Sequence, residues 1–239
     1  MRACAAQPRD FRPSAAIYDL DGTLLDIEPL YYDAFVDATR QINPNYEHTP
    51  KLHTDLLLGR QEKEGAARLL AHLAVTHVTP EELLSMRDSV LIRGMKDVKP
   101  MPGAFQLVSA ARASGLRTAI ATSSMRSHLE HKRESNEELF GCVDAIICGD
   151  DDGVRGRGKP NPAIFLAAAS ALGVSPSTCI AFEDSLAGIT AAVAAGMVVV
   201  AVPDPRLTEA DVVELHPHWI VRSLLDVDWT LLGLDRRVS

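Results

Sequence analysis

Short apolar runs recur along the chain, and several of them end in small or polar residues. Their lengths and their content of Val, Ile and Ala are typical of buried strands. Between them lie segments with helical character, such as 105–113, 164–172 and 186–195. Strands that alternate with helices predict an α/β fold: a Rossmann-like parallel sheet covered by helices on both faces. The predicted strands are 14–19, 116–121, 143–148, 178–182 and 197–202, with a weaker one at 218–221.

Residues 26–98 interrupt this alternation with one helical signal after another and no clear strand. The segment Thr79-Pro80-Glu81-Glu82, for example, is a capping box with proline at the first helical position. We therefore expect a helical domain at 26–98, inserted into a core domain formed by 14–25 and 99–239. Its other helical segments are expected around 30–42, 52–58 and 69–73.

The composition fits an ordinary globular protein and restricts its partners. Of 239 residues, 46% are hydrophobic and 23% are charged. The formal net charge is −8, so we expect neither a nucleic-acid partner nor binding to an anionic membrane surface. An anionic substrate would have to be bound by local cations or by a metal ion.

Cysteine usage and the N-terminal sequence favour a cytoplasmic protein. The four cysteines form no CxxC pair and are expected to be reduced thiols. No apolar run approaches the length of a membrane span. Residues 1–13 lack the apolar region of a signal peptide and are expected to form a flexible tail. Nothing in the sequence indicates assembly, so a monomer is the default expectation.

Two carboxylates, Asp19 and Asp21, come directly after the first predicted strand. In an extended segment, residues two apart point to the same side. Such a pair is unstable unless something neutralises it, and a hard cation with oxygen ligands, usually Mg²⁺, does so. The alternative is a solvated turn, because Asp-Gly is a common turn dipeptide.

Three small hydroxyl residues, Thr122, Ser123 and Ser124, end the next strand. Hydroxyls and backbone N–H groups at the start of a helix form an anion site. A plain serine N-cap explains the same pattern, and this segment alone does not exclude it.

A lysine and a further pair of acids follow two later segments. Lys159 lies in Gly158-Lys159-Pro160-Asn161-Pro162, just before a helix that Asn161 is expected to cap. Glu183 and Asp184 end the apolar run 178–182. Each feature alone has a common explanation as a surface lysine or a capping loop. Because the carboxyl ends of parallel strands lie on one edge of a sheet, we expect all these groups to meet there.

Taken together, these motifs resemble the haloacid dehalogenase superfamily of aspartyl-nucleophile phosphohydrolases. The four family motifs appear in order: DxDGTLLD at 19–26, the hydroxyl of Thr122, Lys159 in GKPNP, and the acids of FEDS at 182–185. The resemblance extends over about 14–232 and implies a phosphatase. It also implies that the helical insertion is a four-helix cap domain.

The resemblance implies a role for each motif residue. Asp19 would be the nucleophile that forms an aspartyl-phosphate, and Asp21 the general acid and base. Thr122 and the backbone amide of Ser123 would bind the phosphoryl oxygens. Lys159 would offset the negative charge of Asp19 and of the phosphate.

A magnesium site is implied at the same edge. Its ligands would be the Asp19 carboxylate, the backbone carbonyl of Asp21 and Asp184, with Glu183 either a further ligand or a support for the ligands. In the cap, Arg60 and Glu62 are candidates for contacting the alcohol part of the substrate, although a solvated helix start explains them equally well.

The substrate is expected to be a small phosphorylated metabolite. The segments ATSS, HKRE at 131–134, GDDD and GKPNPAIFLAAA resemble pseudouridine-5′-phosphatase-like proteins, which makes pseudouridine 5′-phosphate the first expectation. A β-phosphoglucomutase-like phosphomutase and phosphatases of sugar phosphates, glycerol phosphate or flavin mononucleotide remain open. A catalytically idle binding protein is a further alternative, but every motif residue is intact.

Overall fold

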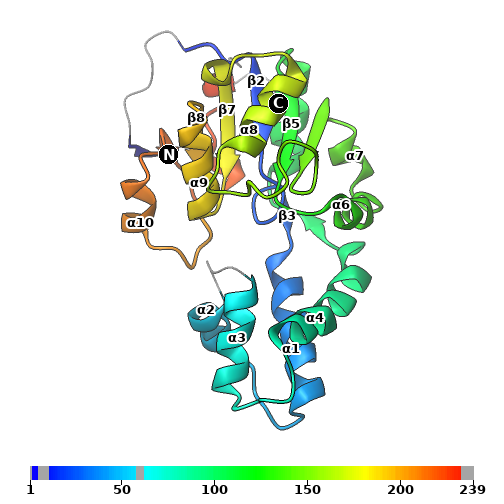
Figure 1. Cartoon of the computed structure of the whole chain (residues 1–239). Coiled ribbons are helices and arrows are strands. Elements are labelled where there is room, and N and C mark those ends of the chain that lie inside the picture. The colour runs from blue at the N-terminus through cyan, green and yellow to red at the C-terminus, as the bar shows by residue number, and fades with distance from the viewer. Residues whose placement is uncertain (1, 5–10, 58–61, 233–239) are drawn as a thin grey trace. The chain divides into compact units, whose positions relative to one another are not determined.

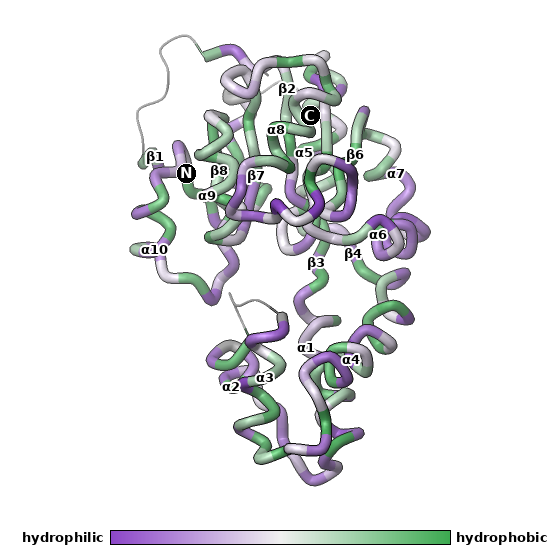
Figure 2. The backbone as a smooth tube through the Cα atoms, viewed as in Figure 1, coloured by the Kyte–Doolittle hydropathy of each residue, from purple (hydrophilic) through white to green (hydrophobic). Residues whose placement is uncertain are grey.

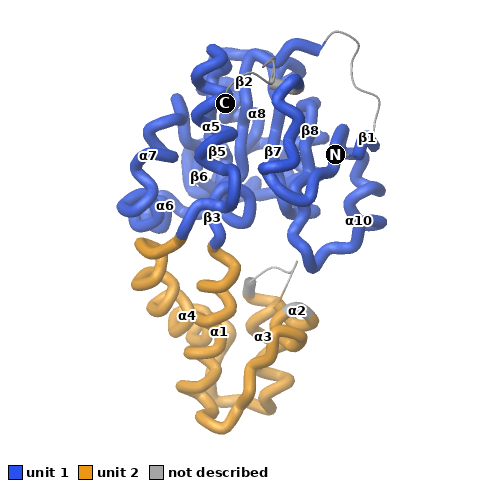
Figure 3. Tube along the Cα trace, turned by 180° about the vertical axis from the view of Figure 1, so that it is seen from behind, with its two compact units in different colours: residues 1–26, 99–239 blue, residues 27–98 orange. Residues whose placement is uncertain are grey.

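The computed structural model describes residues 2–4, 11–57 and 62–232. The chain divides into two compact units, one made of 1–26 and 99–239, the other of 27–98. We call the first the core unit and the second the helical unit; Figure 3 shows them in different colours. No helix within the described ranges is long and apolar enough to cross a membrane.

The core unit contains a seven-stranded sheet with the order β1-β9-β8-β7-β2-β5-β6 (Figure 1). All neighbouring strands are parallel except the edge pair of β1 and β9. The parallel sheet with flanking helices confirms the predicted fold class. The strands are β1 (Arg2–Ala3), β2 (Ala15–Tyr18), β5 (Arg117–Thr122), β6 (Ala145–Cys148), β7 (Cys179–Glu183), β8 (Val198–Ala201) and β9 (Trp219–Ile220).

The central strands are buried on both faces, which explains their nearly continuous apolar sequences. Every residue of β2, β7 and β8 is buried. Figure 2 shows hydrophobic residues along these strands and along the helices α8 and α9 that flank them. Side chains such as Ile17, Phe165 and Ile189 form one apolar core between these elements. The helices of the core unit are α5 (Ala104–Ala113), α6 (Arg126–Arg133), α7 (Glu137–Phe140), α8 (Ala163–Leu172), α9 (Leu186–Ala194) and α10 (Glu209–Glu214), with 3₁₀ turns at Pro176–Thr178, Leu224–Asp226 and Trp229–Leu232.

Within the predicted flexible tail (1–13), residues 1 and 5–10 lie outside the described residues, whereas residues 2–4 lie at the edge of the sheet. Arg2–Ala3 form β1, which pairs antiparallel with β9, and the backbone N–H of Cys4 donates to the carbonyl of His218. The Arg2 guanidinium also pairs with Glu209. A strand of two residues is too short to show a side-chain pattern by which the sequence could reveal it.

Two short strands lie at the borders of the helical insertion. β3 (Leu25–Asp26) pairs antiparallel with β4 (Lys99–Pro100). No strand is predicted here from the sequence, because two-residue strands show no alternation of polar and apolar positions. This pairing holds together the two chain segments that lead from the core unit into the helical unit and back.

In the part of the helical unit that the structure describes, four helices form where the sequence predicts helical segments. They enclose a separate apolar core formed by Phe35, Leu69 and Leu83, among other residues. Thr79 and Glu82 form the predicted capping box at the start of α4. The short helix expected at 52–58 begins at Pro50, two residues earlier than predicted, and the predicted end at residue 58 lies outside the described residues. The helices are α1 (Glu28–Ile42), α2 (Pro50–Leu56), α3 (Glu62–His72) and α4 (Pro80–Met95).

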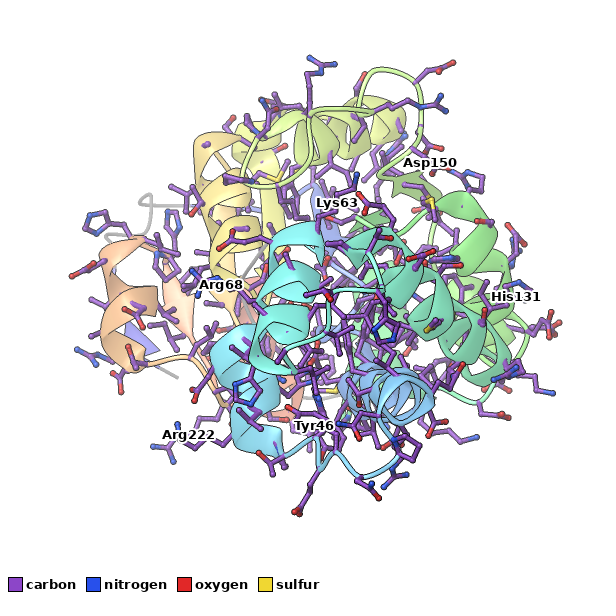
Figure 4. All side chains as sticks on the ribbon, turned by 60° about the horizontal axis from the view of Figure 1, so that its bottom comes forward. Tyr46, Lys63, Arg68, His131, Asp150 and Arg222 are labelled. Carbon is purple, nitrogen blue, oxygen red and sulfur yellow. The ribbon has the colours of Figure 1, made fainter. Side chains whose placement is uncertain are left out.

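A buried histidine should make the helical unit sensitive to acid. His48 Nε2 lies 3.1 Å from Nδ1 of His53, while Nδ1 of His48 is buried without a hydrogen-bond partner. Tyr46, labelled in Figure 4, and Phe35 pack against the His48 ring. Burial lowers the pKa of His48 to about 4. Between about pH 6.5 and about pH 4, His48 binds a proton in the unfolded chain but not in the folded one. The free energy of unfolding therefore falls as the pH drops from about 6.5 to about 4.

We expect this histidine to cost about 2 kcal/mol of unfolding free energy between pH 7.5 and pH 5. The measurement is urea unfolding at both pH values for wild type and for His48→Gln. The glutamine variant should lose less stability on acidification than wild type. His77→Gln, at an exposed position in the same unit, serves as the control and should behave as wild type. Equal acid sensitivity of His48→Gln and wild type would contradict this assignment.

Candidate active site

Strand register places the motif residues at one edge of the sheet. Tyr18 at the end of β2 pairs with Ile120 of β5 on one side and with Phe182 of β7 on the other. The backbone N–H of Asp19 continues the ladder by donating to the Phe182 carbonyl at 3.0 Å. Asp19, Thr122 and the Glu183–Asp184 pair therefore leave three adjacent strands at nearly the same level.

Lys159 connects the acids of two strands. Its Nζ donates to Oδ1 of Asp19 and to Oε1 of Glu183, each at 2.5 Å. All three side chains are at least nine-tenths buried. The ammonium also lies 5.1 Å from the centre of the Phe165 ring. The sequence predicted this convergence, although the two hydrogen-bonded carboxylates lie 140 and 24 residues from the lysine.

Burial dominates the electrostatics of these groups. It raises the pKa of Asp19 to about 7; the Lys159 ammonium opposes this rise, and the Glu183 and Asp21 carboxylates add to it. Burial alone would lower the pKa of Lys159, but its two carboxylate partners outweigh that effect and raise it. Lys159 therefore remains charged at neutral pH. Oδ2 of Asp19 is buried without a hydrogen-bond partner and is the acceptor left for a ligand.

Asp184 lies against the loop that follows β2. The Thr23 hydroxyl donates to Oδ1 of Asp184 at 3.1 Å. Gly22 has φ +93°, and a Cβ at this position would lie 2.3 Å from Oδ2 of Asp184. Glycine is therefore required both by the backbone conformation and by the close approach of the carboxylate. Burial, together with the charges of Glu183 and Asp19, raises the pKa of Asp184 well above its ordinary value.

Glu183 uses both of its oxygens within the protein. Oε1 accepts from Lys159, and Oε2 accepts from the backbone N–H and the hydroxyl of Ser185. Ser185 also caps α9 by accepting from the N–H of Gly188. Of the two roles left open for Glu183, metal ligand or support for the ligands, these contacts favour support.

The hydroxyl segment after β5 does not cap the next helix. The N-cap of α6 is Met125, so the plain serine cap considered for this segment is not formed. Instead, the buried Thr122 hydroxyl accepts from the backbone N–H of Ser124 at 3.1 Å, which fixes the turn. Ser123 is exposed. Phosphate contacts by Thr122 and Ser123 remain a prediction.

Sequence reasoning missed Lys132. Its Nζ lies 2.7 Å from both carboxylate oxygens of Asp21 and 2.8 Å from the Ser124 hydroxyl. Lys132 follows Leu129 by three residues on the otherwise polar helix α6, and the structure buries both side chains. A lysine on the apolar side of a helix needs a buried partner.

The cap of the helix after Lys159 and the two substrate contacts predicted in the helical unit have different outcomes. The helix after Lys159 begins at Ala163 with Pro162 as its N-cap, one residue later than predicted. Asn161 still binds the helix start by accepting from the N–H of Ala163 at 3.0 Å.

Arg60, a candidate substrate contact, lies outside the described residues, and for Glu62 only the backbone at the start of α3 is described. The roles of Arg60 and Glu62 remain predictions.

The donor set of this edge fits a magnesium ion. Asp19 and Asp184 supply carboxylate oxygens, the ligands that Mg²⁺ prefers. Oδ2 of Asp19 is a buried acceptor without a donor, which a hard cation would satisfy. Four carboxylates converge here and two lysines compensate part of their charge, so a divalent cation would balance the remainder.

Ligands of open parallel α/β sheets bind at this carboxyl edge, and the acids and lysines gathered there are typical of the active site of an α/β enzyme. Residues 13–196 match the haloacid dehalogenase-like hydrolase family, and the chain belongs to this family.

Named relatives and a solved structure agree with this assignment. The chain is 36% identical over 221 residues to a Drosophila melanogaster protein named "Probable pseudouridine-5'-phosphatase", with coverage of 91% of this chain and 93% of the relative. It is 32% identical to "(DL)-glycerol-3-phosphatase 2" of Arabidopsis thaliana, covering 88% and 87%. A HAD family hydrolase from Deinococcus radiodurans R1, crystallised with bound phosphate and sodium, matches the fold with a TM-score of 0.78 at 24% identity, covering 94% and 97%. The chain is thus a phosphatase of small phosphorylated substrates.

Proposed function

We propose that this protein is a Mg²⁺-dependent phosphatase that works through a phosphorylated Asp19, with pseudouridine 5′-phosphate as its substrate. The observation that carries the proposal is the state of the Asp19 carboxylate. Lys159 holds Oδ1, while Oδ2 is buried and has no hydrogen-bond partner. Lys159 thus holds this carboxylate in place, and one of its oxygens has no partner within the protein.

In the first step, a carboxylate oxygen of Asp19 attacks phosphorus and the ester P–O bond breaks. Asp21 gives its proton to the departing alcohol oxygen, and the product is an aspartyl-phosphate. A positioned general acid of this kind contributes about 10²–10⁴ in rate.

In the second step, water attacks the phosphorus of the aspartyl-phosphate. Asp21, now a carboxylate, takes the proton from this water, and the P–O bond to Asp19 breaks to release inorganic phosphate. The same residue therefore serves as acid and then as base, so each turnover returns it to its starting state.

Asp19, the backbone carbonyl of Asp21 and Asp184 would hold the magnesium ion. When bound, the ion supplies positive charge that stabilises the anionic phosphoryl group. Lys159 keeps its charge beside Asp19 and reduces repulsion between the nucleophile and the phosphate. Glu183 holds Lys159 in place through Oε1. The Thr122 hydroxyl and the Ser123 amide would bind phosphoryl oxygens.

Pseudouridine 5′-phosphate is supported by the Drosophila relative, which matches over nearly its whole length. Glycerol 3-phosphate is the second candidate because the Arabidopsis phosphatase is only slightly less similar. The helical unit would act as the cap that selects the alcohol, with Arg60 and Glu62 as the predicted contacts. Such a cap excludes bulk water when it closes.

The test is release of inorganic phosphate from pseudouridine 5′-phosphate, uridine 5′-phosphate and glycerol 3-phosphate, with and without Mg²⁺. We expect the highest kcat/KM for pseudouridine 5′-phosphate and no turnover after chelation. Uridine 5′-phosphate is the matched control, because only the attachment of the base differs. Preferred turnover of glycerol 3-phosphate would overturn the substrate assignment. Isomerised phosphate esters instead of free phosphate would identify a phosphomutase.

A further inference from the structure

Lys132 is a second buried lysine at this edge, and the proposed chemistry has so far given it no role. Its side chain has no solvent exposure, whereas the Asp21 side chain is 21% exposed. Nζ contacts both oxygens of Asp21 at 2.7 Å and the Ser124 hydroxyl at 2.8 Å. All three hydrogens of the ammonium can therefore be used in this cluster.

Ser124 makes the third contact with the carboxylate. Its hydroxyl donates to Oδ2 of Asp21 at 2.6 Å. The lysine comes from α6 and the serine from the turn after β5, so two elements distant in sequence from Asp21 fix its orientation. Both contacts lie within the core unit.

The position of Lys132 is itself fixed at both ends of α6. At the start of the helix, the backbone N–H of Arg126 donates to Asp150 at 2.9 Å, and its guanidinium pairs with Asp151 at 2.6 Å. At the end, Nδ2 of Asn136 donates to the backbone carbonyl of Lys132 at 2.8 Å.

The residues on either side of Lys132 in α6 are exposed to solvent, unlike Lys132 itself. His131 lies at the surface of the core unit, and its side chain is 42% exposed (Figure 4). Arg133 is also exposed. Burial and three polar contacts therefore distinguish Lys132 from the basic residues beside it.

The two lysines pair with different carboxylates of the site. Lys159 bridges Asp19 and Glu183, and Lys132 contacts Asp21. We propose that Lys132, together with Ser124, is a positioning residue that holds the Asp21 carboxylate in the orientation needed for proton transfer. This proposal rests on the acid–base role proposed for Asp21 above.

Substrates with different leaving groups distinguish a positioning role of Lys132 from a purely structural one. An alkyl phosphate releases a strongly basic alkoxide, which needs the proton of Asp21 as the P–O bond breaks. p-Nitrophenyl phosphate releases a phenolate whose conjugate acid has a pKa of about 7 and needs little protonation. For both esters, kcat/KM reports the steps up to transfer of the phosphoryl group to Asp19.

The experiment measures kcat/KM of Lys132→Met and Ser124→Ala with one alkyl ester and one aryl ester. The alkyl ester is glycerol 3-phosphate or pseudouridine 5′-phosphate, whichever the wild-type enzyme hydrolyses faster, and the aryl ester is p-nitrophenyl phosphate. We expect Lys132→Met to lose about 10²-fold on the alkyl ester and only about twofold on the aryl ester. Ser124→Ala should show the same selectivity with a smaller loss. Arg133→Met, at the exposed neighbouring position, is the control and should match wild type on both esters.

Equal losses on both esters in Lys132→Met and Ser124→Ala would overturn the positioning role. Should Lys132→Met fail to fold, Ser124→Ala decides by the same criterion. Addition of Lys132→Met to Asp21→Asn should lower alkyl-ester turnover little beyond Asp21→Asn alone, and multiplied losses would contradict the proposal. If wild type hydrolyses neither ester, the proposed function fails as well; if it hydrolyses both without the predicted selectivity, only the role of Lys132 fails.

Discussion

Asp19→Asn is expected to lower kcat on every phosphate ester by at least about 10⁴-fold, because the amide cannot accept the phosphoryl group. The fold should persist, since asparagine has nearly the same shape and Lys159 keeps Glu183 as its partner. The measurements are phosphate release under saturating substrate and the thermal unfolding midpoint.

Asp26→Asn is the matched control for this variant. Asp26 belongs to the same sequence motif, but it is exposed and pairs in β3 with Lys99 of β4. Its activity should stay within about threefold of wild type, as expected for an exposed side chain to which the proposed chemistry gives no role. Turnover of Asp19→Asn at a tenth or more of the wild-type rate would exclude Asp19 as the nucleophile.

Lys159→Met is expected to reduce both activity and stability. The substitution leaves Asp19 and Glu183 facing each other in a buried site without a cation. Removal of one partner from a buried ion pair costs about 3–5 kcal/mol. We expect that loss in urea unfolding at pH 7.5 without metal, together with a fall in kcat of about 10³-fold because the charge beside the nucleophile is gone.

Lys63→Met provides the comparison for this stability effect. Lys63 pairs with Glu81 at 3.1 Å, but its side chain is 73% exposed. An exposed pair of this kind contributes little to stability, because solvent screens it. Comparable stability losses in Lys63→Met and Lys159→Met would contradict the view that Lys159 neutralises a buried acidic cluster.

The sequence predicted the sheet and the convergence of its motifs for a physical reason. Parallel central strands are buried on both faces, so their apolar runs stand out, and each functional segment directly follows such a run. Once the strands are placed, the carboxyl ends must share an edge. Asp19, Lys159 and Glu183 meet there although Lys159 lies in a loop rather than at a strand end.

The remaining features depend on contacts that no local pattern encodes. Lys132 reaches Asp21 across 111 residues of sequence, and its helix is too short and too polar to reveal an apolar face clearly. The pairing of Arg2–Ala3 with β9 likewise depends on backbone hydrogen bonds at the sheet edge. In both cases tertiary structure supplies the partner, which the local sequence does not show.

The most direct test of the central claim is to locate the phosphoryl group during turnover. Wild-type enzyme is mixed with substrate and Mg²⁺, quenched in acid within milliseconds, digested and mapped by mass spectrometry. We predict one acid-stable, base-labile phosphoryl group on the peptide that contains Asp19, and none in Asp19→Asn. A phosphoryl group on a different residue, or its presence in Asp19→Asn, would contradict the proposal that Asp19 carries the reaction.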